Sequence, residues 1–196
     1  VAPKYPQSGM ASSVSLGLKP IAVKDLGVRD EVHWVYVDAT PASCVKYALD
    51  VLMFGNEPDV IVSGINHGSN AASASCYSGT LGVCIEAAVD GIPSVGISLD
   101  CMHHTADFSA VEKLFPEILH EISALHDGCY GVYYNVNFPD LPADKIKGVR
   151  LCSQGKGHWI KEFDKWDENY AERNGYDLAK YGYNHPEVKA EEGEEF

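Results

Sequence analysis

Strand-like and helix-like segments alternate along this chain, and that alternation constrains the fold more than any other feature. Residues 32–37 (VHWVYV) form a β-branched and aromatic run that is typical of a strand. Further short runs that we expect to be strands occupy residues 59–62, 95–99, 132–136 and 149–152. Helical spacing fills residues 42–54, 80–89 and 108–125. This order predicts an α/β fold whose mostly parallel sheet is covered by helices on both faces.

The loops that follow strands are the places to search for a functional site. In parallel α/β sheets, ligands bind beyond the carboxyl ends of the strands. Residues 63–70 (SGINHGSN) follow one of the apolar runs directly. Residues 3–9 (PKYPQSG) also follow a strand if residues 1–3 (VAP) are the end of one, as we expect.

The segment 63–70 permits two interpretations. Asn66 and Asn70 offer neutral oxygen ligands of the kind that suit Mg²⁺ or Mn²⁺, although a divalent site would also need carboxylates from elsewhere. Alternatively, the Asn and Ser side chains cap the backbone of their own loop. His67, between them, is a candidate for contacting an anionic substrate.

Residues 76–80 (CYSGT) lie immediately before a predicted helix and are equally open to two interpretations. Ser78 and Thr80 can present hydroxyl and amide groups at the helix N-terminus, a place that binds phosphate readily, and Gly79 lets the backbone turn. An ordinary N-cap accounts for the same residues. Ser8, in the small-residue loop PQSGMASS, is a candidate to ligate a metal or contact phosphate.

Composition excludes several classes of function. The formal net charge of −13 argues against binding to nucleic-acid polymers. No apolar run approaches the length of a membrane span, and no secretory leader is present, so we expect a cytoplasmic protein. The six cysteines form no C-x-x-C pair and are predicted to be small buried hydrophobes. The motifs G-x-S-x-G and G-x-G-x-x-G are absent, which weakens a serine-hydrolase or a dinucleotide-binding interpretation.

The composition changes near residue 159. Residues 1–158 carry the alternation of strands and helices and are predicted to form the α/β core. Residues 159–196 are polar, aromatic and rich in turns, with eleven acidic and five basic residues. We interpret this second segment as an arm that leaves the core, with a possible role in oligomerisation.

Five segments, taken in order, resemble the SurE family of 5′/3′-nucleotidases. They read VAP…QSG, ATPASCV, PDVIVSGINHGSN, YSGT…EAAVDGIPSVGISL and NVNFPDLPADKIKGVR, and they span residues 1–158. The resemblance implies a three-layer, Rossmann-like fold and a metal-dependent phosphatase. Such an enzyme hydrolyses nucleoside 5′- and 3′-monophosphates to nucleoside and phosphate. It also implies a homodimer or homotetramer.

The resemblance implies roles for individual residues as well. In the family, one divalent ion (Mg²⁺ or Mn²⁺) is held by an aspartate pair, by a Ser that matches Ser8 and by an Asn that matches Asn66. The family's phosphate-contacting turn matches residues 78–80. The residues expected to bind substrate or phosphate are Ser78, Gly79, Thr80, His67 and Asn70.

The family's aspartate pair has no counterpart in this sequence, so no catalytic residue can be named. We expect the chain to be a SurE core clipped at both ends. Because Ser8 and Asn66 carry no charge, it should hold Mg²⁺ weakly and have little activity. The alternatives are a non-catalytic, oligomerising protein that binds an anion or nucleotide, and a broad acid phosphatase.

Overall fold

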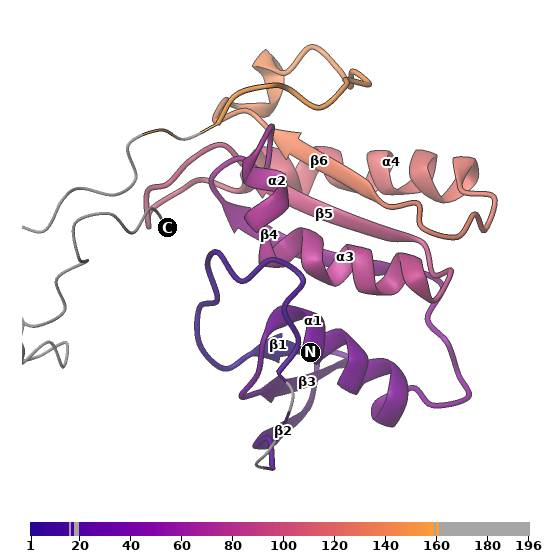
Figure 1. Ribbon diagram of the computed structural model, residues 1–196. Helices are drawn as coiled ribbons and strands as arrows, with labels where there is room; N and C mark the ends of the chain where they lie inside the picture. The colour runs from indigo at the N-terminus through magenta and orange to yellow at the C-terminus, as the bar shows by residue number, and fades with distance from the viewer. Residues whose placement is uncertain (16, 18–19, 159, 161–196) are drawn as a thin grey trace, which may run out of the picture. The chain divides into compact units, whose positions relative to one another are not determined.

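Two three-stranded sheets organise the protein in the computed structural model (Figure 1). The structure describes residues 1–15, 17, 20–158 and 160. The first sheet has the strand order β1 (Ala2–Pro3), β3 (Val32–Val37), β2 (Val23–Arg29). The second has the order β4 (Ile61–His67), β5 (Ser94–Leu99), β6 (Tyr134–Phe138). The helices are α1 (Pro41–Tyr47), η1 (Ala48–Leu52), α2 (Ala74–Tyr77), α3 (Gly79–Val89), α4 (Ser109–Leu125) and η2 (Ala143–Lys145).

The larger hydrophobic cluster lies between β5 and α4. β5 is buried at all six positions, and β4 and β6 pair with it in parallel on its two sides. Its larger side chains share one face of the strand and pack with residues of α4 and β6. The buried members of the cluster are Val95, Ile97, Leu99, Cys101, Val111, Ile122 and Phe138.

The opposite face of β5 is lined by small residues, which allow α3 to approach closely. A Cβ on Gly96 would lie 2.5 Å from Leu81 Cδ2, so any larger residue there would overlap with α3. Ser94 Oγ donates a 2.9 Å hydrogen bond to the carbonyl oxygen of Cys84 in the same helix. Figure 1 shows α3 and α4 on opposite sides of the second sheet. The prediction of a mostly parallel sheet with helices on both faces is therefore confirmed for this sheet.

The first sheet is mixed and has a much smaller core. β1 pairs with β3 in parallel, whereas β2 pairs with β3 antiparallel and is exposed along its whole length. The buried cluster on this sheet consists of Val37, Ala39 and Cys44. The sequence interpretation missed β2 because its residues show no buried face.

The helix signals in the sequence are confirmed at both α1 and α3. Thr40 caps α1 by accepting a hydrogen bond from the Ser43 amide, and Pro41 takes the first helical position. α1 then continues as the π-helical segment η1, and Gly55 follows with a positive φ of 73°. Ser78 caps α3 in the same way, accepting from the Leu81 amide at 3.1 Å.

Several predicted boundaries are corrected. β4 begins at Ile61 rather than at residue 59 and runs on through His67, so five of the eight residues of the presumed loop 63–70 are strand. β6 lies two residues later than predicted, and residues 149–152 form no strand. The predicted strands 32–37 and 95–99 and the predicted helices 80–89 and 108–125 match β3, β5, α3 and α4 within one residue. The predicted arm lies, apart from Ile160, outside the described residues.

The cysteine prediction is half right. Cys44, Cys84 and Cys101 are buried, but Cys76, Cys129 and Cys152 are exposed. In the described part of the chain, none of the helices combines the length and the hydrophobicity that crossing a bilayer requires.

Candidate active site

Asn66, near the carboxyl end of β4, holds its carboxamide in a defined orientation. Its Nδ2 donates to the carbonyl oxygens of His67 at 3.2 Å and of Gly68 at 2.8 Å. Its Oδ1 instead faces α3, where Thr80 Oγ1 donates to it at 3.5 Å. The nitrogen therefore caps the turn while the oxygen keeps acceptor capacity for a hard cation. The two interpretations of this segment are compatible.

The first turn of α3 offers free backbone donors. Ser78 is 9% exposed and its hydroxyl is occupied by capping, so the N-cap interpretation holds for this residue. The N–H groups of Gly79 and Thr80 find no acceptor among the described residues. Unpaired N–H groups and the helix dipole together favour an anion at this point.

The loop that carries Ser8 is attached to the rest of the protein at three points. Its start is fixed by the Lys4 amide, which donates to Val37 O at 2.9 Å. Its middle is fixed by the Ala11 amide, which donates to Tyr77 O at 3.0 Å. At its end, the Ser15 amide donates to Ser43 Oγ at 2.7 Å.

Gly82 lets this loop rest directly on α3. A Cβ at Gly82 would overlap with the carbonyl group of Ala11, and a Cβ at Gly79 would lie 3.3 Å from Gln7 O. The residue next to Gln7 is Ser8, which is exposed. The loop of Ser8 and the carboxamide of Asn66 therefore both lie against the first turns of α3.

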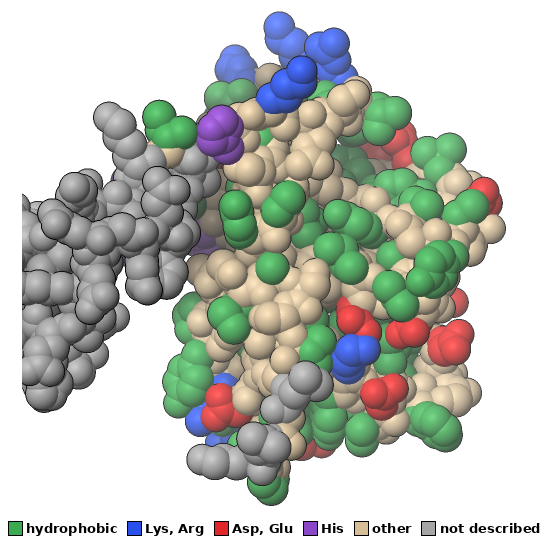
Figure 2. Space-filling model, in the orientation of Figure 1, with side chains coloured by type: hydrophobic (Ala, Val, Ile, Leu, Met, Phe, Trp, Pro, Cys, Tyr) green, Lys and Arg blue, Asp and Glu red, His purple; other side chains and the backbone are tan. Residues whose placement is uncertain are grey.

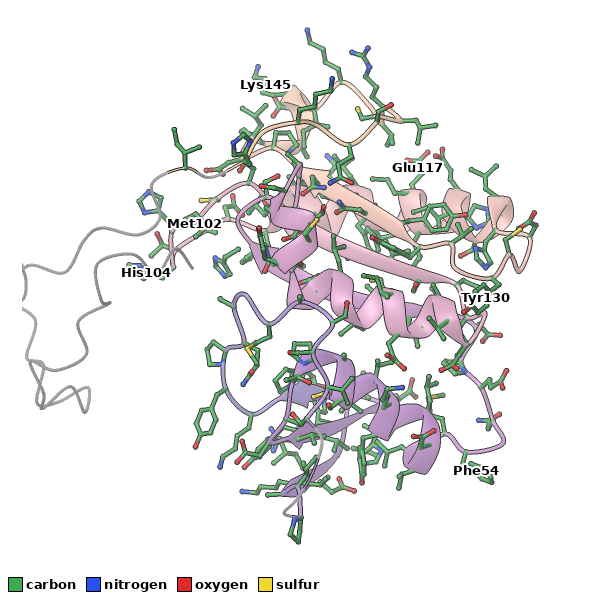
Figure 3. The ribbon with its side chains drawn as sticks, viewed as in Figure 1. Phe54, Met102, His104, Glu117, Tyr130 and Lys145 are labelled. Atoms are coloured by element: carbon green, nitrogen blue, oxygen red, sulfur yellow. The ribbon has the colours of Figure 1, made fainter. Side chains whose placement is uncertain are left out.

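His67 lies at the same end of the second sheet with an exposed side chain. Its ring packs edge-on against Phe108, with 5.1 Å between the ring centroids, and Nδ1 lies 3.2 Å from the carbonyl oxygen of His103. Figure 3 shows Met102 and His104 at this end of the sheet and Tyr130 at the other. His103 and His104 are exposed, as expected for a surface loop.

Asn70 is one of the predicted site residues that are buried. It is 4% exposed, and its Nδ2 donates to Ser98 Oγ on β5 at 2.8 Å. Its backbone N–H donates to Asn137 Oδ1 at 2.8 Å. These bonds direct Asn70 into the protein interior.

Two segments that contact the first turns of α3 carry neutral oxygens that suit a hard cation. Asn66 Oδ1 and the Ser8 hydroxyl are the oxygens that such an ion prefers. In the described residues, no group of three or more His, Cys, Asp or Glu side chains forms a metal site. Asn66 and Ser8 are neutral and supply none of the negative charge that would balance a divalent ion.

Comparison with known proteins identifies the family of the chain. The family model described as "Survival protein SurE" matches residues 1–161. The chain belongs to the SurE family.

Curated SurE relatives match most of this SurE-family chain. A protein of Cytophaga hutchinsonii named 5′-nucleotidase SurE is 37% identical over 174 residues, covering 88% of the chain and 66% of the relative. A protein of the same name from Syntrophobacter fumaroxidans is 40% identical, covering 84% of the chain and 64% of the relative. The crystal structure of the SurE protein from Aquifex aeolicus matches with a TM-score of 0.66 at 30% identity, covering 79% of this chain and 60% of that one. The chain thus spans just under two thirds of the length of these relatives.

The structure adds residues that the sequence interpretation did not assign to the site. Gln154 Nε2 donates to Ala72 O at 3.1 Å, and the Ser73 amide donates to Gly157 O at 3.1 Å, so residues 154–157 lie against the segment after Asn70. The basic residues Lys145, Lys147, Arg150 and Lys156 are all exposed. Figure 2 shows Lys and Arg side chains together at the top of the view, where Figure 3 labels Lys145. The sequence does mark this segment, because residues 145–156 contain four basic and no acidic side chains in an otherwise acidic chain.

Proposed function

We propose that the protein is a metal-dependent phosphatase that hydrolyses nucleoside 5′- and 3′-monophosphates to nucleoside and phosphate. The observation that carries this proposal is that Asn66 on β4 and the Ser8 loop both contact the first turns of α3. Asn66 Oδ1 lies 3.5 Å from Thr80 Oγ1, and the backbone of the Ser8 loop lies against Gly79 and Gly82. The relatives are named 5′-nucleotidase SurE, which supports the same substrate class.

The residues of the first turn of α3 take the phosphate in this proposal. The free N–H groups of Gly79 and Thr80 bind phosphoryl oxygens, and the helix dipole stabilises the charge that develops on them. Ser78 keeps the turn in shape through its cap. His67 is exposed at the end of β4 and contacts the anionic substrate from that side.

Ser8 and Asn66 would hold a divalent cation, Mg²⁺ or Mn²⁺. When bound, the cation supplies Lewis-acid polarisation of a phosphoryl oxygen and activation of water. Because both ligands are neutral, we expect the chain as given to bind the cation weakly and to turn over slowly.

Two alternatives have observations in their favour. The lack of a charged metal cluster in the described residues favours a non-catalytic protein of the same fold that binds an anion or nucleotide. The exposed basic segment 145–156 would suit a broad acid phosphatase with larger anionic substrates. In all three cases we propose a cytoplasmic homodimer or homotetramer, as the resemblance to SurE implies.

Phosphate release from AMP, measured with Mn²⁺ and then with a chelator, tests the proposal. We expect slow release that the chelator abolishes. Asn66→Ala should strongly lower the metal-dependent release, and unchanged rate and Mn²⁺ affinity would exclude Asn66 from the site. Thr80→Ala should raise the KM for AMP while changing the stability of the protein little. Thr80→Ser keeps the hydroxyl and is the matched control.

The same assay separates the alternatives. Binding of AMP without release under any metal condition would favour the non-catalytic protein. Release from polyphosphate and sugar phosphates at rates similar to those for AMP would favour the broad phosphatase.

A further inference from the structure

A network of side-chain hydrogen bonds links β6 to the segment that follows β4. Asn137 Oδ1 accepts hydrogen bonds from the Asn70 amide at 2.8 Å and from Ser69 Oγ at 3.2 Å. Asn137 Nδ2 donates to Asn135 Oδ1 at 2.9 Å, and Asn135 Nδ2 donates to Asn70 O at 3.0 Å. Asn135 and Asn137 lie two positions apart on one strand, so their side chains share a face. Together they hold both the N–H and the C=O of Asn70.

The central strand holds the same segment from a second direction. Asn70 Nδ2 donates to Ser98 Oγ at 2.8 Å, and Ser98 is fully buried. Asn137 pairs with Ser98 in the register of β5 and β6. Asn70 and Ser98 are the buried members of this network, so loss of a partner leaves their polar groups unsatisfied, whereas Asn135 and Asn137 are exposed.

The constraint reaches Asn66 through Gly68. The Gly68 amide donates to Leu99 O at 2.8 Å and to Cys101 O at 3.1 Å, which fixes Gly68 at the end of β5. The carbonyl oxygen of Gly68 in turn accepts from Asn66 Nδ2 at 2.8 Å. The turn from Asn66 to Asn70 is therefore fixed at Gly68 by β5 and at Asn70 by β6.

We infer that Asn137 and Asn135 of β6 are positioning residues that direct Asn66 Oδ1 toward the first turn of α3. They act through the backbone of residues 68–70, and neither is bonded to Asn66 or to α3 among the described residues. The catalytic meaning of this inference rests on the proposed function, because it assumes that Asn66 Oδ1 is a ligand. Asn70, predicted to bind substrate, then serves as the link between β6 and Asn66.

Nuclear magnetic resonance of the Asn66 carboxamide in the full chain tests the positioning role without any ligand. In Asn137→Ala, the carboxamide protons of Asn66 should exchange with water faster by about tenfold, the ratio expected for loss of one hydrogen bond. Asn137→Asp retains an acceptor for the Asn70 amide and for Ser69 Oγ, so it should restore most of the protection. Asn135→Ala provides a second variant if Asn137→Ala does not fold.

Ser94→Ala is the matched control for a purely structural loss. Ser94 is fully buried on β5 and bonds to Cys84 O at 2.9 Å, on the face that packs against α3. This control should lower stability without changing the exchange of the Asn66 carboxamide. Equal acceleration in Ser94→Ala and Asn137→Ala, or no acceleration in Asn137→Ala, would overturn the inference.

Hydrolysis of AMP with Mn²⁺ forms the second arm. If Asn137 acts through Asn66, Asn137→Ala should lower kcat in the unmutated background and change nothing further in the Asn66→Ala background. Additive losses in the two backgrounds would contradict the route through Asn66. If even the unmutated chain releases no phosphate while the Asn66 exchange responds as expected, the proposed function fails and the positioning of Asn66 is supported.

Discussion

The two sheets that carry the candidate site differ in strand pairing and in how deeply they are buried. β4–β5–β6 is entirely parallel, has helices on both faces and centres on a strand with no exposed position. β1–β3–β2 is mixed, its strand β2 is exposed throughout, and its buried cluster contains Val37, Ala39 and Cys44. Asn66 extends from the β4–β5–β6 sheet, whereas the Ser8 loop follows β1 of the β1–β3–β2 sheet.

Because the two sheets differ in burial, we expect the two parts of the site to differ in rigidity. Local stability follows the amount of buried apolar contact around an element. Asn66 should therefore keep its orientation under conditions in which the Ser8 loop already opens. Four predictions test this contrast, beginning with the largest expected effect.

Leu99→Ala should lower the free energy of unfolding by about 2–5 kcal/mol, because it leaves a cavity in the core of the well-buried sheet. Leu99 is 1% exposed in the cluster between β5 and α4. The Val28 side chain on β2 is 68% exposed, so Val28→Ala should change the free energy of unfolding by no more than about 0.5 kcal/mol. Urea unfolding measures both variants. Equal losses would mean that the two sheets do not differ in the way that burial indicates.

Gly82→Ala tests the place where the Ser8 loop meets α3. Alanine raises helix propensity by about 1 kcal/mol, but its Cβ would overlap with the backbone of Ala11, and overpacking costs about 1–3 kcal/mol. We expect the loop to move, which should expose the Ala11 amide that now donates to Tyr77 O at 3.0 Å. Hydrogen exchange of that amide is the measurement. If the variant is more stable and its Ala11 amide stays protected, α3 has shifted and the loop has not.

Alkylation of the native protein compares the surroundings of the two sheets through a buried thiol on a helix beside each, Cys44 on α1 and Cys84 on α3. Burial raises the pKa of Cys44 to about 11 and that of Cys84 to about 12, so both react only when their surroundings open. Cys44, beside the smaller core, should be labelled at least about tenfold faster than Cys84, a difference of about 1.4 kcal/mol in opening free energy. Exposed Cys76 should react before either of them and serves as the internal control. Faster labelling of Cys84 would mean that the surroundings of the β4–β5–β6 sheet open more readily than those of the β1–β3–β2 sheet.

Removal of the two helix caps should have the smallest effects. Thr40→Ala at α1 and Ser78→Ala at α3 should each cost about 1 kcal/mol. The loss at Thr40 should be the larger one, because its Oγ1 also donates to Ser43 Oγ at 3.0 Å. Ser78→Asp keeps a capping acceptor but adds negative charge, so it should retain stability and lose affinity for phosphate. Phosphate affinity unchanged in Ser78→Asp would place the anion elsewhere.

The elements that could be predicted from the sequence are those with a clear buried pattern. β3, β5, α3 and α4 each show an apolar period or a capping residue, and each was found within one residue. β2 could not be predicted in this way, since an exposed edge strand imposes no apolar period. β4 was assigned too short because Ser63, Gly64 and Asn66 are turn-forming residues that tertiary pairing with β5 holds in a strand.

The candidate site could be predicted by residue type but not by orientation. Asn66 and Asn70 offer the same chemistry in the sequence, yet Asn66 Oδ1 faces α3 while Asn70 is buried against Ser98. That choice depends on Asn135 and Asn137, which lie more than sixty residues later in the chain. Contacts between residues so far apart in the chain cannot be inferred from the spacing of residues within one segment.

The two faces of β5 also determine how this strand tolerates mutation. Toward α4, Val95, Ile97 and Leu99 should accept exchange among aliphatic side chains of similar volume. Toward α3, Gly96 leaves no room for a side chain, and Ser94 and Ser98 each carry a hydrogen bond. A saturation scan of the strand should therefore alternate with a period of two, between positions that select for hydrophobicity and positions that select for small size.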